Sequence, residues 1–161
     1  MTEHATPVIG QFSGRYRFLS NFYFSPFPAT MLGSERIFPT AEHAFQGAKV
    51  LACGSWARAN KIRWLDDLLA NSSAGAAKRA GKRIPIDLDV WTPLSIPVMA
   101  TVLATKFKDP YLRGLLTSTG DAVLIEGNDW GDRLWGQSGG KGRNLLGKML
   151  MVERDRIFET S

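Results

Sequence analysis

The sequence is poor in the residues that form disulfides and zinc sites. Its 161 residues include one cysteine, Cys53, and two histidines, His4 and His43. A single cysteine excludes an intramolecular disulfide, and this composition also excludes a zinc site built from several cysteines or histidines. We expect Cys53 to be a small buried residue at the end of an apolar helix rather than a catalytic thiol.

Long hydrophobic runs are also missing. No stretch of the sequence approaches the roughly 18 apolar residues that a membrane span needs. Residues 1–11 lack the charged and then apolar pattern of a secretory signal. We therefore expect no membrane partner and a cytoplasmic, intracellular location.

The composition is otherwise that of a globular protein with a moderate positive charge. Hydrophobic residues make up 44% and charged residues 22%, and the net charge is +5. This charge favours anionic ligands such as nucleic acid, nucleotides or phosphates, without choosing among them. The middle of the chain is basic, and we slightly prefer a solvated face over contact with DNA phosphates; its residues are Lys61, Arg63, Lys78, Arg79, Lys82 and Arg83.

Apolar spacing and capping residues predict a mostly helical α+β protein with a few short strands. The length fits one domain, placed at residues 11–158 after a flexible leader of residues 1–10. A hairpin is expected at 31–37 with its turn at Gly33–Ser34, a buried strand at 122–126, and a loop or short strand at 84–96. The expected helices cover residues 40–53, 56–69, 73–80, 96–107, 110–116 and 144–158.

Glu42 is the strongest candidate for a chemical role. It follows Thr40, a residue type that caps helices, and so falls in a first helical turn where the dipole favours negative charge. A carboxylate in such a place could act as an acid, as a base or as a stabiliser of positive charge. Position alone favours a plainer role, in which Glu42 complements the helix dipole or pairs with Lys49 or Arg36.

A glycine-rich stretch at 127–143, GNDWGDRLWGQSGGKGR, is the most unusual segment. Asp129 and Asp132 are candidate acids, although aspartate in such a loop commonly forms turns. Two tryptophans, at 130 and 135, must pack on the protein or stack on a ligand. The backbone amides of residues 139–144, with Lys141 and Arg143, could hold a phosphate where the last helix begins; a flexible helix entry explains them equally well.

Taken together, five segments in order resemble the NADAR (YbiA-like) family over roughly residues 12–156. They are FLSNFYFSPF (18–27), FPTAEHAFQGAKV (38–50), VMATVLATKF (98–107) after Trp91, LLTSTGDAVLIEGNDWGDRLWG (115–136) and GKGRNLLGKMLMVER (140–154). The resemblance implies a compact, mostly helical α+β fold. It also implies an N-glycosidase acting on ribosylated bases, with no metal and no cofactor.

The resemblance also implies which residues form the site. Glu42 would be the main catalytic carboxylate and Asp132 a second acid. Lys49 would hold a phosphate, pair with Glu42 or attack an opened ribose as a Schiff-base amine, and these three roles stay open. His43 is expected to be packed and hydrogen-bonded. The substrate-binding residues would be Ser20, Asn21, Gln46, Trp91, Trp135, Gly136, Arg143 and Asn144.

Three functions follow as alternatives. The first is removal of ADP-ribose from ADP-ribosylated guanine in a nucleotide or nucleic acid. The second is breakdown of phosphoribosyl-pyrimidine intermediates of riboflavin biosynthesis. The third is a non-catalytic module that binds ADP-ribose or NAD. Two acids in one pocket argue against the third, because a pure binder of an anion gains little from them. No protein partner is expected.

Overall fold

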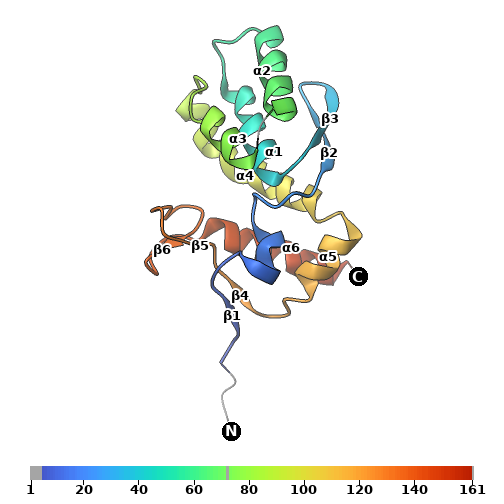
Figure 1. The fold of residues 1–161 in the computed structure, drawn as a ribbon, viewed down its shortest axis with the longest axis vertical. Coiled ribbons are helices and arrows are strands. Elements are labelled where there is room, and N and C mark those ends of the chain that lie inside the picture. The colour runs from blue at the N-terminus through green and yellow to red at the C-terminus, as the bar shows by residue number, and fades with distance from the viewer. Residues whose placement is uncertain (1–4, 72, 161) are drawn as a thin grey trace. The chain divides into compact units, whose positions relative to one another are not determined.

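A computed structural model describes residues 5–71 and 73–160 of the chain. Contacts divide the protein into two compact units. Unit 1 contains both ends of the sequence, residues 5–20 and 107–160, and unit 2 is the continuous segment 21–106. Helices outweigh strands in both units, which confirms the expected mostly helical α+β class (Figure 1).

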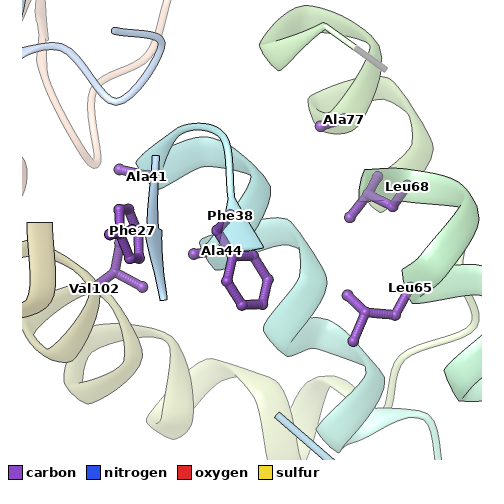
Figure 2. Packing of buried hydrophobic residues seen from close by; sticks show 8 residues of the cluster. All are labelled: Phe27, Phe38, Ala41, Ala44, Leu65, Leu68, Ala77 and Val102. Atoms are coloured by element: carbon purple, nitrogen blue, oxygen red, sulfur yellow. The ribbon is translucent and has the colours of Figure 1, made fainter. Parts of the chain in front are cut away.

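Unit 2 consists of a β-hairpin and a set of packed helices. The hairpin and helix α1 share a core, shown in Figure 2, whose buried side chains are Phe27, Phe38, Ala41, Ala44, Leu65, Leu68, Ala77 and Val102. Burial of these apolar side chains is the main force that holds the unit together. Its elements are β2 (Phe27–Met31), β3 (Ser34–Phe38), α1 (Ala41–Gly47), the 3₁₀ helix η2 (Ala48–Ala52), α2 (Arg58–Asn71), α3 (Ala74–Gly81) and α4 (Leu88–Lys106).

The hairpin turn lies one residue earlier than expected. Strands β2 and β3 pair antiparallel from Phe27 with Phe38 to Met31 with Ser34. The two residues between them, Leu32 and Gly33, have φ of 53° and 77°. Two-residue turns with positive φ at both positions match the twist of the strands, so the turn centres on Leu32–Gly33 and not on Gly33–Ser34.

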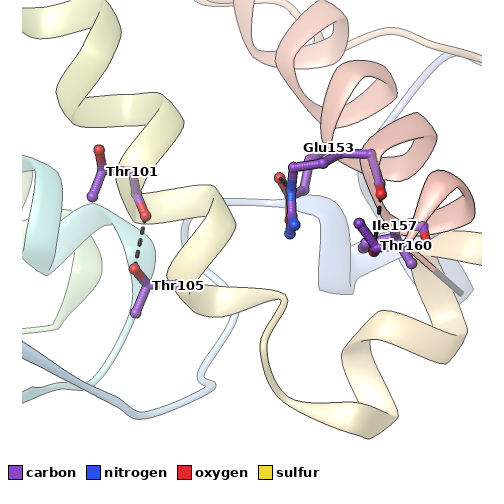
Figure 3. A network of polar contacts seen from close by, with 6 residues as sticks. Thr101, Thr105, Glu153, Ile157 and Thr160 are labelled. Carbon is purple, nitrogen blue, oxygen red and sulfur yellow. Dashed lines mark hydrogen bonds and ion pairs between the residues drawn. The ribbon is translucent and has the colours of Figure 1, made fainter.

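The segment expected as a loop at 84–96 is largely helical, which corrects that prediction. Helix α4 begins at Leu88 and contains Pro93 and Pro97. Proline in a helix removes a backbone hydrogen bond, so its presence argued for a loop. Contacts of α4 with α1, η2 and β2 stabilise it instead, and buried Trp91 and Met99 lie on that packed face. The hydroxyl of Thr105 donates to the Thr101 carbonyl at 2.8 Å within this helix (Figure 3).

Helix α4 is also long and apolar enough to cross a membrane by length and composition alone. We had expected no such stretch in the sequence. The same test is passed by core helices of globular proteins, and α4 packs against other elements of unit 2 along one side. It also carries Asp89 in its first turn and the buried Lys106 in its last.

Unit 1 joins the two ends of the sequence through a short parallel strand pair. Strand β1 (Val8–Ile9) pairs with β4 (Val123–Leu124), so the expected leader of residues 1–10 includes a strand, and its first four residues lie outside the described ones. The expected strand at 122–126 is reduced to its central pair. The other elements are η1 (Gly14–Leu19), α5 (Pro110–Thr117), β5 (Gly127–Asn128), β6 (Gln137–Ser138) and α6 (Leu145–Glu159).

Side chains cap several helix ends, and the cap by Thr40 was expected from the sequence. The side chains of Thr40, Ser73 and Asp109 each accept a hydrogen bond from a first-turn backbone amide of the following helix. At the end of α6, the Thr160 hydroxyl donates to the Ile157 carbonyl at 3.2 Å (Figure 3).

Candidate functional site

Glu42 lies in the first turn of α1, and the residues around it hold that turn in place. The Thr40 hydroxyl accepts from the His43 backbone amide at 3.2 Å and contacts His43 Nδ1 at 2.9 Å. The Glu42 backbone amide donates to the Asn21 carbonyl at 2.9 Å. His43 is 1% exposed, which confirms the expected packed, hydrogen-bonded histidine.

The Glu42 carboxylate is buried and held by a neighbouring amide. Glu42 is 6% exposed, and its Oε1 accepts a hydrogen bond from Gln46 Nε2 at 2.8 Å. The two residues are four apart in α1 and therefore share a helix face, as the sequence predicted. Burying a carboxylate costs free energy unless hydrogen bonds or charges stabilise it. The fold therefore holds Glu42 in place, which distinguishes it from an acid that merely lies on the surface.

Lys49 lies in η2, directly after α1, where the charge of Glu42 acts on its amine, and it is hydrogen-bonded to helix α3. Its Nζ donates to the Gly81 carbonyl at 3.0 Å and lies 5.9 Å from the centre of the Trp91 ring. Burial lowers the pKa of the Lys49 amine from its ordinary value of 10.5, and the charge of Glu42 opposes this shift. Two nearby lysines, Lys82 and Lys78, further lower the pKa of Lys49.

Trp91 forms a wall of this site from helix α4. It is 7% exposed and packs against Phe45, with ring centroids 5.3 Å apart and the planes tilted by 57°. Phe45 is on α1 and was not expected in the site. Trp91 therefore supports α1 and Lys49, and its predicted stacking on a ligand stays a prediction.

Two buried side-chain oxygens beside Glu42 have no hydrogen-bond partner among the described residues. They are Oδ1 of Asn21 and Oε1 of Gln46, whose residues are 8% and 5% exposed. The Asn21 amide nitrogen reaches only the sulfur of Met99, at 3.5 Å. Buried polar atoms are normally satisfied, so each unpaired oxygen calls for a donor such as a ligand hydroxyl or N–H.

The predicted residues of the glycine-rich loop lie in unit 1, where their described contacts are with the loop's own backbone. Asp132 Oδ1 accepts from the amides of Leu134 and Trp135 at 3.0 and 2.9 Å. The Asn128 side chain binds the Asp132 backbone at both ends of its amide. This geometry is the turn-forming role of aspartate that the sequence also allowed, and the second-acid role of Asp132 stays a prediction.

Asn144 and Gly136 have clear structural roles in the same unit. Asn144 Nδ2 donates to the Leu124 carbonyl at 2.8 Å, and its Oδ1 accepts from the Glu126 amide at 3.0 Å. A Cβ on Gly136 would lie 2.2 Å from the Glu126 carbonyl, so only glycine fits there. These contacts explain both residues without a ligand, and their predicted contact with substrate is untested.

The remaining predicted residues are at the edges of unit 1. Arg143 is exposed and its backbone amide donates to the Arg133 carbonyl at 2.7 Å. Trp135 is half-buried in the loop. Ser20 ends the η1 helix, with its amide donating to the Arg17 carbonyl at 3.0 Å. The structure thus gathers Asn21, Glu42, Gln46, Lys49 and Trp91 within unit 2 and Asp132, Trp135, Gly136, Arg143 and Asn144 within unit 1.

Over residues 5–71 and 73–160, no group of three or more histidine, cysteine, aspartate or glutamate side chains could hold a metal ion. A separate apolar cavity of about 320 Å³ lies between the hairpin and α4, against Ala44 and Ala48. Each of these alanines is two residues from Gln46 and so points to a different side of the helical segment from Glu42 and Gln46. This cavity therefore does not belong to the site around the carboxylate.

Gly81 is a further residue that sequence reasoning did not place in the site. The helix predicted at 73–80 extends to Gly81, the last residue of α3, which contacts both Gln46 and Lys49. No local signal in the sequence identifies this contact, because α1 and α3 are brought together by the tertiary fold.

Comparison with known proteins agrees with this fold over almost the whole chain. The NADAR domain profile matches residues 10–158. N-glycosidase YbiA of Escherichia coli (strain K12) is 33% identical over 125 residues, which cover 76% of this chain and 72% of that protein. A riboflavin biosynthesis protein of Vibrio vulnificus (strain YJ016) is 30% identical over 145 residues, covering 88% of this chain and 36% of the relative.

A solved structure supports the same relationship. The NMR structure of Escherichia coli YbiA superposes with a TM-score of 0.76 at 30% sequence identity, covering 97% of this chain and 88% of that one. Sequence and fold therefore agree over both units. The chain belongs to the NADAR family of YbiA-like N-glycosidases.

Proposed function

We propose that this protein hydrolyses the N-glycosidic bond between the ribose C1′ and a base nitrogen, with Glu42 as the central carboxylate. The observation that carries the proposal is the buried Glu42 side chain, with one oxygen held by Gln46 and with a partly buried lysine on whose amine its charge acts. In the reaction the C1′–N bond breaks, the oxygen of water bonds to C1′, and one proton of that water passes to the base.

Glu42 contributes to this reaction in two ways. A fixed negative charge stabilises the oxocarbenium-like centre that develops at C1′ as the bond breaks. The same carboxylate accepts a proton from the attacking water. Gln46 holds one oxygen of this carboxylate through its side-chain amide.

Lys49 has a second proposed role as a nucleophile. Burial lowers the pKa of its amine, which increases the fraction of neutral amine that is able to attack an opened ribose. The Lys49 nitrogen would then bond to C1′ as the C1′–base bond breaks, the base would leave with a proton, and water would hydrolyse the resulting imine to free the amine. Borohydride treatment during turnover tests this step, because it reduces an imine to a stable adduct that mass spectrometry detects on Lys49. Absence of the adduct during active turnover assigns Lys49 to phosphate binding or charge pairing.

ADP-ribosylated guanine is the first substrate that we propose. Its pyrophosphate suits a chain with a net charge of +5, and its guanine and ribose carry N–H and hydroxyl donors for the unpaired oxygen of Asn21. Nucleic acid carrying this modification would add phosphates that the basic residues of α3 are able to contact.

A phosphoribosyl-pyrimidine from riboflavin biosynthesis is the second candidate. The observation that favours it is that relatives in Vibrio vulnificus and Zea mays are named as riboflavin biosynthesis proteins. Its ribose hydroxyls and phosphate present the same kinds of donor and charge to the site.

A substrate comparison by mass spectrometry separates these candidates. The purified protein is incubated with ADP-ribosylated guanosine, ADP-ribosylated DNA and the riboflavin intermediate, and release of free base is measured. We expect Glu42→Gln to lower the rate by about 10²- to 10⁴-fold, the usual contribution of acid–base groups. Glu35→Gln is the matched control, since Glu35 is exposed on β3. Full activity of Glu42→Gln would refute the proposed role, and tight binding without turnover of any substrate would identify a binding module.

A further inference from the structure

Gly81 lies at a contact between α3 and α1 that leaves no space for a side chain. A Cβ built on Gly81 would lie 2.0 Å from Oε1 of Gln46 and 3.1 Å from Gln46 Cβ. Gly81 is not among the glycines with positive φ, so its backbone conformation does not require glycine. The constraint is therefore steric, and it is exerted by the Gln46 side chain.

The orientation of the Gln46 amide follows from its two neighbours. Nε2 donates to Glu42 Oε1 at 2.8 Å, which directs Oε1 towards Gly81. A glycine hydrogen occupies the direction in which other residues have Cβ, so the close approach of Oε1 is a Cα–H···O contact. Any larger group at position 81 would push the amide away from this place and disturb its hydrogen bond to Glu42.

The carbonyl of the same residue holds the other polar side chain of the site. Gly81 O accepts from Lys49 Nζ at 3.0 Å. One residue at the end of α3 thus contacts both Gln46, which binds Glu42, and Lys49, whose amine is influenced by the charge of Glu42.

We propose that Gly81 is a positioning residue of the N-glycosidase site, acting through Gln46 to fix the Glu42 carboxylate and through its carbonyl to fix Lys49. This inference rests on the proposed function, in which Glu42 is the central carboxylate. Gly81 itself does not touch the reacting atoms.

The test compares two alanine substitutions in the same helix. Gly81→Ala should lower kcat by about tenfold or more, because the hydrogen bond to a charged group is lost or bent. KM should change less, because the other predicted binding residues of unit 2, Asn21 and Trp91, are not among the groups nearest to a Cβ at position 81. Gly75→Ala is the matched control: its Cβ would lie 3.6 Å from Arg79 Nη1 and 3.9 Å from Phe22, which are ordinary contacts. The control should keep kcat within about twofold of the wild-type value. Both variants gain helix propensity when alanine replaces glycine, so this gain does not explain a difference in kcat between them.

A double-mutant cycle shows whether Gly81 acts through Gln46. In the Gln46→Ala background the amide is absent and only the Cβ contact at 3.1 Å remains, so adding Gly81→Ala should cause a much smaller further loss of kcat. If Gly81→Ala alone does not fold, the double variant still allows kcat to be measured, because truncation of Gln46 removes the closest contact of the new side chain. Equal kcat of Gly81→Ala and wild type, or fully additive losses in the cycle, would overturn the proposal.

A readout independent of turnover separates this inference from the proposed function. The side-chain amide signals of Gln46 in a ¹⁵N–¹H spectrum report its hydrogen bond to Glu42. Gly81→Ala should shift these signals, and Gly75→Ala should leave them in place. Shifted signals in Gly81→Ala without turnover of any substrate by the wild type would support the positioning by Gly81 and refute the glycosidase proposal. Unchanged signals in Gly81→Ala would refute the positioning.

Discussion

Replacing Asn144 with alanine should destabilise the protein strongly, because the Asn144 amide joins two backbone segments. Its side chain donates to the Leu124 carbonyl at 2.8 Å and accepts from the Glu126 amide at 3.0 Å. Removing it leaves two backbone groups unpaired, at about 1–3 kcal/mol each when buried. Water can reach the partly buried Glu126 amide, so we take about 2–4 kcal/mol for the pair.

Backbone conformation adds to this cost. Asn144 has φ of 51°, in the left-handed region that asparagine tolerates and alanine does not, which costs about 1 kcal/mol. The free energy of unfolding should therefore fall by about 3–5 kcal/mol in Asn144→Ala. This corresponds to a fall in Tm of about 6–20 °C for a chain of this size. Asn144→Gly should lose about 1 kcal/mol less, because glycine accepts the backbone angle.

Urea unfolding followed by tryptophan fluorescence measures these values, with Arg143→Ala as the control. Arg143 is exposed, so its truncation should change stability by less than about 0.5 kcal/mol. A loss below about 0.5 kcal/mol in Asn144→Ala, together with a raised KM, would refute the structural role and favour the predicted contact with substrate.

Two further predictions concern buried titratable groups. Burial lowers the pKa of the Lys49 amine below 10.5, so just below that pH the unfolded chain binds more protons and stability should rise with pH. Lys49→Met should remove this rise in the free energy of urea unfolding as the pH approaches 10.5 from below, and an unchanged slope would contradict the lowered pKa. Cys53 is 0% exposed and burial raises the pKa of its thiol, so a thiol reagent should label it only as fast as the protein opens. Rapid labelling of the folded protein would contradict this buried position.

The sequence predicted the features that depend on neighbouring residues. The capping side chains of Thr40, Ser73 and Asp109 act within one helical turn, so the starts of α1, α3 and α5 were predictable. The shared face of Glu42 and Gln46 follows from their spacing of four in a helix. Family resemblance supplied what position alone did not, namely the preference for Glu42 as a catalytic carboxylate.

Features that depend on distant contacts could not be predicted in this way. Pro93 and Pro97 argued for a loop, and only the packing of α4 on other elements of unit 2 explains their place in a helix. The close contact between Gly81 and Gln46 depends on how α3 meets α1. The hydrogen bonds of Asn144 reach the strand β4 region, some twenty residues earlier in the chain, and no short motif encodes them.

The path of the chain through the two units has a consequence for synthesis on the ribosome. Unit 2 is continuous, so every residue that surrounds Glu42 in it is translated before most of unit 1. Strand β1 is translated before unit 2 and cannot pair with β4 until unit 2 has also been translated, because the whole of unit 2 lies between the two strands in the sequence. The helical segment that carries the carboxylate is thus free to fold while the ends of the chain are still apart, and the β1–β4 pairing comes late because closing such a long loop is slow.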